Sequence, residues 1–277
     1  MTTLADLISE RFGIATETGA DHPGEGPLAA FLKHATRRRY TEEPVGDDLL
    51  NVLLACAQSA SSKSDLQQVS IIVVRDVAAR AAFADGLPGM PWVRQAPVFL
   101  VFCGDVSRGR KIAAMRGYDH ANDNVDTFMN AAVDAALAMQ AFIGAAAVAG
   151  LGTCPISHIR NDVENCVEVL GLPPGVFPVS GLCVGWPVGE AYVTLRLPPS
   201  VVVHQDRYDD LDLEAELDAY DARRHARFPI KPESQRHTDK YGVAEVCTWS
   251  ENVARQLSVS ERPGFRDFLK GHGLALD

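Results

Sequence analysis

Four segments of this chain combine residue types that could bind an anion or a flat aromatic ring. The first, residues 34–40, reads His-Ala-Thr-Arg-Arg-Arg-Tyr and lies just before Pro44 and the start of an expected helix. A phosphate needs N–H and guanidinium donors that converge on its oxygens, and this segment is rich in both. Taken alone, it is more typical of a solvated basic turn, so it becomes informative only together with the other three.

The other three segments could approach a ring closely because they contain many small residues. Residues 59–67 form a serine-rich stretch between an apolar helix and a strand, and its hydroxyl, amide and lysine groups could address the polar edge of a ring. Residues 150–161 are glycine-bearing and follow a long apolar stretch, and residues 181–187 end a strand with glycines. Each segment is equally compatible with an ordinary connection or a tightly packed strand.

The motifs of several common enzyme classes are absent. No G-x-G-x-x-G lies between a strand and a helix, and no G-x-x-x-x-G-K, H-E-x-x-H or G-x-S-x-G occurs. This argues against a Rossmann dehydrogenase, a P-loop enzyme and an α/β-hydrolase. The six cysteines lack the close spacing of a metal site, and most lie in apolar runs, which is typical of buried free thiols in a reducing compartment.

Length and charge narrow the class further. The 277 residues carry a net charge of −10, with 26 basic and 36 acidic side chains, which argues against a nucleic-acid partner. No signal peptide is recognisable at the N-terminus, and the apolar stretch 131–151 is interrupted by Asp134 and Gln140, so we expect a cytoplasmic protein with no membrane partner.

The elements that must position these segments follow from hydrophobic periodicity and capping residues. Short β-branched or apolar runs predict strands at 69–74, 98–103 and 176–184, the second of them central in a sheet. Helices are expected after Gly46, after Asp76, from Asn124 to Val148, from Asn161 to Leu170, over 211–224, after Ser250, and from Phe265. The alternation predicts an α/β or α+β fold around one sheet.

The order and spacing of the four segments resemble the nitroreductase family, in particular its NADPH-preferring flavin reductase and oxygen-insensitive nitroreductase branch. That branch opens with H-x-S-x-R, and here His34, Thr36 and Arg38 stand in this pattern. The serine-rich stretch ending in Leu-Gln, a Gln-Ala-Pro before an apolar strand, the Gly-Leu-Gly segment and a Gly-Leu-Cys-Val-Gly-Trp-Pro tract follow in the same order. Each motif is weak, but together they cover residues 30–205 well and 206–277 weakly.

The resemblance implies an α+β, nitroreductase-like fold: a central, mostly antiparallel sheet flanked by helices, in a homodimer. It divides the chain into an N-terminal arm (1–33), an FMN-binding core (34–205) and a C-terminal helical excursion of the same domain (206–277). The cofactor is FMN, the electron donor is NADPH or NADH, and a small electron-deficient acceptor takes the hydride by a ping-pong scheme. FMN carries the chemistry, so no catalytic side chain is expected.

The resemblance also implies which residues hold the flavin. One group would bind its phosphate, a second would lie along the ribityl chain and the ring edge, and a third would line the isoalloxazine. In that order, the groups are His34, Ala35, Thr36, Arg38 and Arg196; Ser62 and Ser64; and Pro155, Ile156, Ser157 and His158.

Some positions depart from the family pattern. Met90 replaces a usual glutamine, Thr194 a usual lysine and Ala35 a common arginine, while Ser157 and His158 replace two glycines. These departures leave open a second interpretation, a flavin-binding or redox-sensing protein of the same fold with little turnover. A third alternative is a partner-binding protein whose four segments are ordinary loops. A late basic cluster between Arg223 and Lys240 could receive the 2′-phosphate of NADPH or could simply be solvated.

Overall fold

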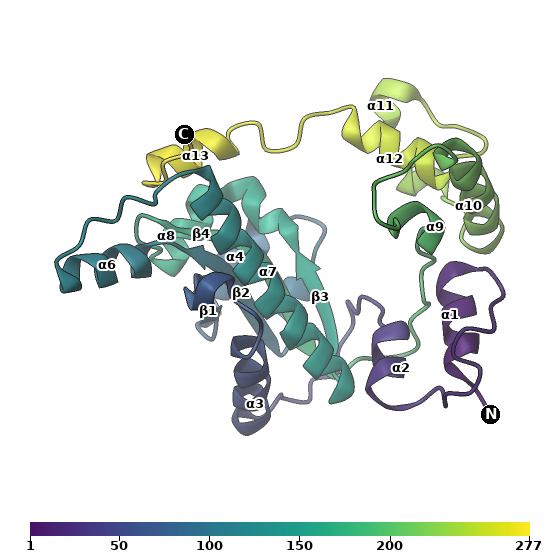
Figure 1. Ribbon diagram of the computed structural model, residues 1–277, viewed down its shortest axis with the longest axis horizontal. Coiled ribbons are helices and arrows are strands. Elements are labelled where there is room, and N and C mark those ends of the chain that lie inside the picture. Colours follow the sequence, from purple (N-terminus) through teal and green to yellow (C-terminus); the bar gives the residue numbers. More distant parts are fainter. The chain divides into compact units, whose positions relative to one another are not determined.

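The computed structural model describes all residues, 1–277, and the chain divides into two compact units (Figure 1). The helical unit comprises Met1–His34 and Tyr192–Glu261. The sheet unit comprises Ala35–Ala191 and Arg262–Asp277. These boundaries differ from the three ranges expected from the sequence, because the N-terminal arm is grouped with most of the C-terminal excursion and the last residues return to the sheet unit.

The sheet unit is built on four strands, and every neighbouring pair is antiparallel. This confirms the three expected strands and the central place of the second, whereas residues 152–156, expected as a connection, form a fourth strand. In spatial order the strands are β1 (Val69–Val73), β2 (Val98–Asp105), β4 (Val176–Gly185) and β3 (Gly152–Ile156).

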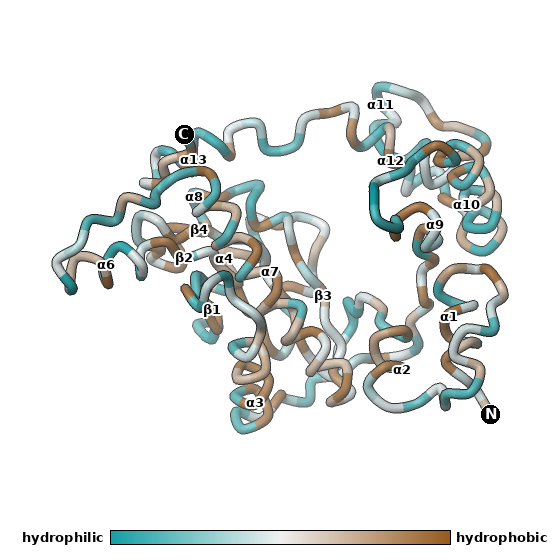
Figure 2. The backbone as a smooth tube through the Cα atoms, viewed as in Figure 1, coloured by the Kyte–Doolittle hydropathy of each residue, from teal (hydrophilic) through white to brown (hydrophobic).

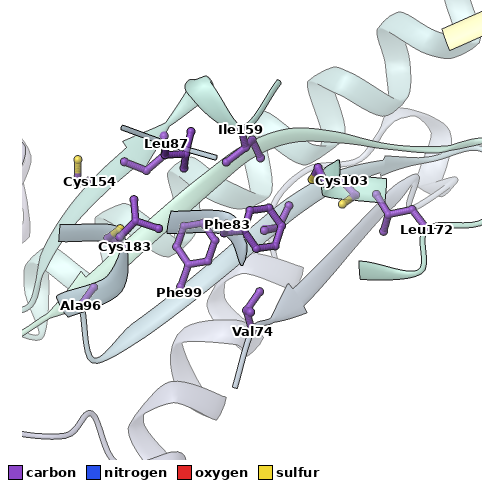
Figure 3. Packing of buried hydrophobic residues seen from close by; sticks show 14 of the residues in the cluster. Val74, Phe83, Leu87, Ala96, Phe99, Cys103, Cys154, Ile159, Leu172 and Cys183 are labelled. Atoms are coloured by element: carbon purple, nitrogen blue, oxygen red, sulfur yellow. The ribbon is translucent and has the colours of Figure 1, made fainter. Parts of the chain in front are cut away.

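Both faces of the sheet are covered, so β2 is buried along its whole length. On one face Phe99 packs against Phe83, with Cys154 and Cys183 in the same cluster (Figure 3). On the other face Phe102 packs against Phe142. Alternate residues of a strand point to opposite faces, which is why a continuous apolar run marks a strand between two helical layers.

The helices of the sheet unit form these layers. Helices α3 and α7 pack on the Phe102 face, and α4, α5 and α8 on the Phe99 face. Their bounds, together with the remaining helical segments of this unit, are α3 (Asp47–Gln58), η1 (Lys63–Asp65), α4 (Val77–Asp85), α5 (Trp92–Gln95), α6 (Ser107–Arg116), α7 (Val125–Val148), η2 (Ser157–Asp162), α8 (Val163–Leu170) and α13 (Phe265–Gly271).

Two expected helix caps are confirmed and two are wrong. Asp76 accepts from the backbone N–H of Ala79, and Asn124 accepts from that of Thr127. Asn161 does not cap α8; its side-chain oxygen accepts instead from the guanidinium of Arg262.

The helix expected after Ser250 begins earlier, because Thr248 caps it and Ser250 is already inside it. The Ser250 side chain donates to the buried carboxylate of Asp221. Short polar residues stand close together at both positions, so local pattern alone does not select the one that caps.

The helical unit contains the remaining helices. Helices α1 and α2 share a small apolar cluster of Leu4, Leu7 and Ala29. Helix α10 packs against α12 through Tyr220 and Trp249. The bounds are α1 (Leu4–Phe12), α2 (Gly26–Leu32), α9 (Pro199–Val202), α10 (Leu213–Arg227), η3 (Pro232–Ser234), α11 (Thr238–Tyr241) and α12 (Trp249–Leu257).

Helix α7 is apolar on its exposed side as well as its buried side (Figure 2). By length and composition alone it could cross a membrane, so the expectation that this stretch is too polar is wrong. Core helices of soluble proteins meet the same two criteria, and α7 packs its other side on the sheet. Its exposed apolar side chains include Val125, Met129, Val133 and Leu137, which are four residues or about one turn apart, and Val148 near its end.

Candidate functional site

The basic segment after His34 is fixed beside the β3 edge of the sheet. The backbone N–H of Arg37 donates to the carbonyl of Thr153 at 2.8 Å, and that of Thr41 donates to Trp186 at 2.9 Å. The Arg37 side chain donates to the Val188 carbonyl at 3.0 Å. Thr36 and Arg38 themselves are exposed. The segment is therefore held by Arg37 and the backbone, which leaves the side chains of Thr36 and Arg38 accessible to a ligand.

Two glycines allow this close approach. A Cβ at Gly152 would lie 2.7 Å from the side chain of Arg37, and a Cβ at Gly185 would lie 2.9 Å from the ring of Tyr40. Such distances are too short for carbon atoms in contact, so a side chain at either position would push these segments apart. The glycine-bearing segments singled out from the sequence thus have a packing role at this edge.

Arg38 lies over the ring of Trp92, with its guanidinium carbon 5.4 Å from the ring centroid. Burial raises the pKa of the neighbouring Cys154 thiol, and the Arg38 charge partly opposes this. Cys154 faces Cys183 directly across the β3–β4 pair, and both are buried free thiols. The chain holds no group of His, Cys, Asp or Glu side chains suited to a metal ion. The chemistry at this edge is therefore that of cationic and N–H donors.

The segment expected to line the isoalloxazine begins where β3 ends. Pro155 and Ile156 are the last residues of β3, and Ser157 and His158 start η2. Ile156 is buried, whereas Pro155, Ser157 and His158 are exposed. Because residues 36–38 run beside β3, the structure brings these two predicted groups to the same edge of the sheet.

The serine-rich loop lies elsewhere, before β1 at the opposite edge of the sheet. Its conformation is set by Asp134, a buried residue of α7 with 2 % of its surface exposed. One carboxylate oxygen of Asp134 accepts from the Ser62 hydroxyl at 2.6 Å and from the Gln68 N–H at 3.0 Å. The other accepts from the Lys63 N–H at 3.1 Å.

The same loop contains three non-glycine residues in the left-handed region. Ser64, Asp65 and Gln67 have φ angles of 50°, 56° and 51°. Such conformations cost of order 1 kcal/mol each and persist where the surroundings enforce them. Arg108 holds the far end of the loop, donating to the carbonyl of Gln67 at 2.5 Å.

A second basic group belongs to the helical unit. The buried guanidinium of Arg11 donates to the carbonyls of Thr194, Leu32 and His34 at 2.9, 2.7 and 2.6 Å. Arg196 donates to the hydroxyl of Thr194 at 2.9 Å. Neither arginine forms an ion pair with a carboxylate.

The effect of these arginines is visible at His34. Burial, followed by the charges of Arg11 and Arg196, lowers the pKa of His34 below its ordinary value. Arg11 is buried and Arg196 is exposed, and two such cations without carboxylate partners are suited to an anion such as a phosphate.

Within one chain, therefore, the predicted site residues form three groups. Ala35, Thr36, Arg38 and the 155–158 segment share the β3 edge, Ser62 and Ser64 lie at the β1 edge, and His34 and Arg196 belong to the helical unit.

Sequence reasoning missed Asp134 and Arg11, although both organise predicted segments. In the sequence, Asp134 is a charged residue within an apolar stretch. That position could have indicated a buried carboxylate that needs hydrogen-bond donors. Arg11 gave no signal, because its partners are backbone carbonyls far along the chain.

Comparisons with known proteins identify the family of this chain. Residues 32–186 match the profile of the Nitroreductase family, and residues 195–277 match that of the Nitroreductase family, C-terminal domain. The chain belongs to the nitroreductase family.

Several characterised relatives span nearly the whole chain. The FMN reductase [NAD(P)H] of Bacillus subtilis is 33% identical, with 90% of this chain and 98% of that protein covered. The oxygen-insensitive NADPH nitroreductase of Salmonella typhimurium is 36% identical, with coverage of 87% and 95%. The structure of NADPH:FMN oxidoreductase from Vibrio harveyi complexed with NAD+ superimposes with a TM-score of 0.79 at 31% identity, covering 90% and 98% of the two chains.

Proposed function

We propose that this chain is an FMN-dependent oxidoreductase that transfers hydride from NADPH or NADH to small electron-deficient acceptors such as nitroaromatics, quinones or flavins. The observation that carries the proposal is that Thr36 and Arg38 are held beside β3, whose end forms the 155–158 segment. A phosphate clamp and a glycine-bearing edge meet there in a chain of the nitroreductase family. Relatives over the full length are named FMN reductases and NADPH nitroreductases.

The donor set fits FMN. In the sheet unit, Thr36 and Arg38, with the backbone of Ala35, supply hydroxyl, guanidinium and N–H donors for a phosphate, and Arg38 has no competing carboxylate. In the helical unit, His34 and Arg196 offer donors of the same kind. Residues 155–158 would face the ring, with the exposed Pro155, Ser157 and His158 forming its near wall. When bound, FMN supplies the hydride chemistry, so the chain needs to bind, orient and shield rather than donate a proton.

The loop that contains Ser62 and Ser64 lies at the other edge of the sheet, so we propose that this loop serves the ring bound by a second copy of the chain. A symmetric homodimer would bring the serine-rich loop of one copy to the β3 edge of the other. The apolar stripe on α7, including Met129, Val133 and Leu137, is the surface we assign to this dimer.

This dimer can be broken by a charge in its centre. Val133→Glu should shift the mass measured by light scattering from two chains to one and abolish FMN binding, because each site would lose the loop from its partner. The matched control is Val77→Glu, at an exposed apolar position on α4, which should leave both unchanged. A Val133→Glu protein that still binds FMN as a monomer would contradict the shared site.

The ping-pong scheme has a kinetic test of its own. NADPH and a quinone such as menadione would take turns at one site, so double-reciprocal plots at several fixed acceptor concentrations should give parallel lines. Intersecting lines would show that both substrates are bound together and would reject this mechanism.

One further candidate function is motivated by three positions. Met90 packs on the apolar cluster of the Phe99 face and offers no amide, Thr194 offers no positive charge, and His158 adds bulk at the exposed end of β3. A flavin-binding or redox-sensing protein with little turnover would retain FMN but show no steady-state consumption of NADPH with any of the acceptors. Thr194 nevertheless accepts a hydrogen bond from Arg196 and so orients this guanidinium. Of the two candidate functions, we therefore favour the active enzyme.

The donor site is proposed for the basic cluster of the helical unit. Arg223 has two buried side-chain nitrogens without a hydrogen-bond partner, whereas Arg227 is paired with Glu10. A guanidinium without a carboxylate partner carries a charge that suits the 2′-phosphate of NADPH. Arg223→Gln should therefore raise the KM for NADPH and leave that for NADH unchanged, while an equal effect on both would assign Arg223 to packing.

A further inference from the structure

The serine-rich loop adopts an unfavourable backbone conformation, and a buried side chain outside the loop accepts hydrogen bonds from both of its ends. Three residues of the loop have positive φ, while Ser62, Lys63 and Gln68 all donate to the carboxylate of Asp134. We propose that Asp134 is a positioning residue for flavin recognition, which holds the loop in its binding conformation before the flavin arrives. This inference rests on the proposed function, because the loop is the segment assigned to the flavin.

The hydrogen-bonding of Ser62 shows that this predicted ligand has another role. Its hydroxyl donates its single proton to Asp134, at 2.6 Å, and accepts from the Gln67 N–H at 2.7 Å. A serine hydroxyl has one proton and two lone pairs, so Ser62 has no proton left for a flavin oxygen or nitrogen. Ser62 is therefore a link between Asp134 and Gln67 rather than a donor to the cofactor.

The groups left available are those of the next two residues. The hydroxyl of Ser64 and the ammonium of Lys63 have no partner within the chain, and both residues are exposed. The Lys63 backbone is fixed by Asp134 while its side chain remains free. We infer that these two side chains address the flavin, and that the carboxylate determines where they point.

A carboxylate suits this role better than any neutral side chain. An ionised carboxylate is an acceptor at both oxygens, so it can receive three donors at once. An asparagine of the same shape has one acceptor oxygen and an NH2 group, which would face the Ser62 hydroxyl or the Lys63 N–H as a competing donor. Asp134→Asn therefore changes the loop contacts with little change in volume.

The first experiment separates loop geometry from general stability. Hydrogen exchange of the purified protein should show that Asp134→Asn loses protection selectively at the amides of Lys63, Gln67 and Gln68. The dissociation constant for FMN, from fluorescence quenching, should rise about tenfold or more because binding must then also order the loop. Phe142→Leu is the control: it weakens core packing in the same helix and should lower the melting temperature while leaving the FMN affinity within about twofold.

A double-mutant cycle tests whether Ser62 acts through Asp134. If Ser62 acts through its hydrogen bond to Asp134, Ser62→Ala should weaken FMN binding, and adding Asp134→Asn should weaken it little further. If Ser62 instead contacts the flavin directly, the two effects on the binding free energy should add. Ser64→Ala should weaken FMN binding without altering hydrogen exchange at residues 62–68.

The outcomes also separate this inference from the proposed function. Unchanged FMN affinity in Asp134→Asn, or an additive cycle, would overturn the positioning role while leaving the flavoprotein assignment intact. A wild-type protein that binds no FMN would overturn both. If Asp134→Asn does not fold, Ser62→Ala is the test. Unaltered hydrogen exchange at residues 62–68 in that variant would equally reject the positioning role of Asp134.

Discussion

In each of the two units, one buried charged side chain fixes a segment that is predicted to bind a ligand, and the two side chains have opposite charge. In the sheet unit, one buried carboxylate, Asp134, accepts from three donors of the serine-rich loop. In the helical unit, one buried guanidinium, Arg11, donates to three backbone carbonyls around His34 and Thr194. Both use a single buried charged group to fix backbone groups that lie mostly outside α-helices and strands.

The difference lies in what each charged side chain leaves for a ligand. The carboxylate consumes loop donors and is itself surrounded by them, so its charge is compensated by Ser62, Lys63 and Gln68. The hydrogen bonds of the guanidinium go only to backbone carbonyls, so a net positive charge remains. Burial lowers the pKa of His34, and this charge lowers it further. Asp134 therefore only fixes the backbone of its loop, whereas Arg11 fixes backbone carbonyls and also leaves a positive potential near His34.

The largest effect should come from removing the guanidinium. Arg11→Met should lower the free energy of unfolding by about 3 kcal/mol, because carbonyls of Leu32, His34 and Thr194 lose a charged donor in a buried position. Urea denaturation followed by circular dichroism would measure this. Arg11→Lys should recover part of the loss, since it keeps the charge without the planar fork.

Equal stability of Arg11→Met and wild type would remove the parallel with Asp134. It would show that packing of α1, rather than the charge, holds residues 32–34.

A smaller effect is expected in the pH dependence of stability. The folded pKa of His34 is depressed, so the unfolded chain takes up the proton first as the pH falls. His34 should therefore reduce stability progressively as the pH falls below about 6.5, and contribute no pH dependence above that. Wild type should lose more of its urea midpoint between pH 7.5 and 5.5 than His34→Gln does. Parallel losses in the two proteins would show that neither burial nor the arginines depress the pKa of His34 in the folded protein.

The smallest effect should come from a surface ion pair of the same unit. Arg227 pairs with Glu10 at 3.1 Å, with both side chains 41% exposed. Exposed pairs of this kind contribute less than about 1 kcal/mol. Arg227→Ala should therefore shift the melting temperature by only a few degrees or less. An effect as large as that of Arg11→Met would mean that burial does not determine how much a charged side chain stabilises this unit.

The sequence predicted what depends on local pattern. The buried strand β2 and the caps Asp76 and Asn124 follow from periodicity and from short polar residues at helix starts. The placement of residues 36–38 beside β3 was expected only through the family resemblance, since it depends on a contact between segments more than a hundred residues apart.

Other features had no sequence signal. The partners of Arg11 are carbonyls, which every residue possesses, and those of Asp134 lie 66 to 72 residues earlier in the chain. The roles of Ser62 and Ser64 could not be separated either, because both are serines in one loop and only the hydrogen bonds to Asp134 and Gln67 distinguish them.

The most direct test of the whole account is the visible absorbance spectrum of the purified protein, recorded before and after anaerobic addition of NADPH. We predict the two absorption bands of an oxidised flavin, release of FMN on heating, and prompt bleaching by the nicotinamide. A colourless protein that releases no FMN and takes none up when it is supplied would contradict the account.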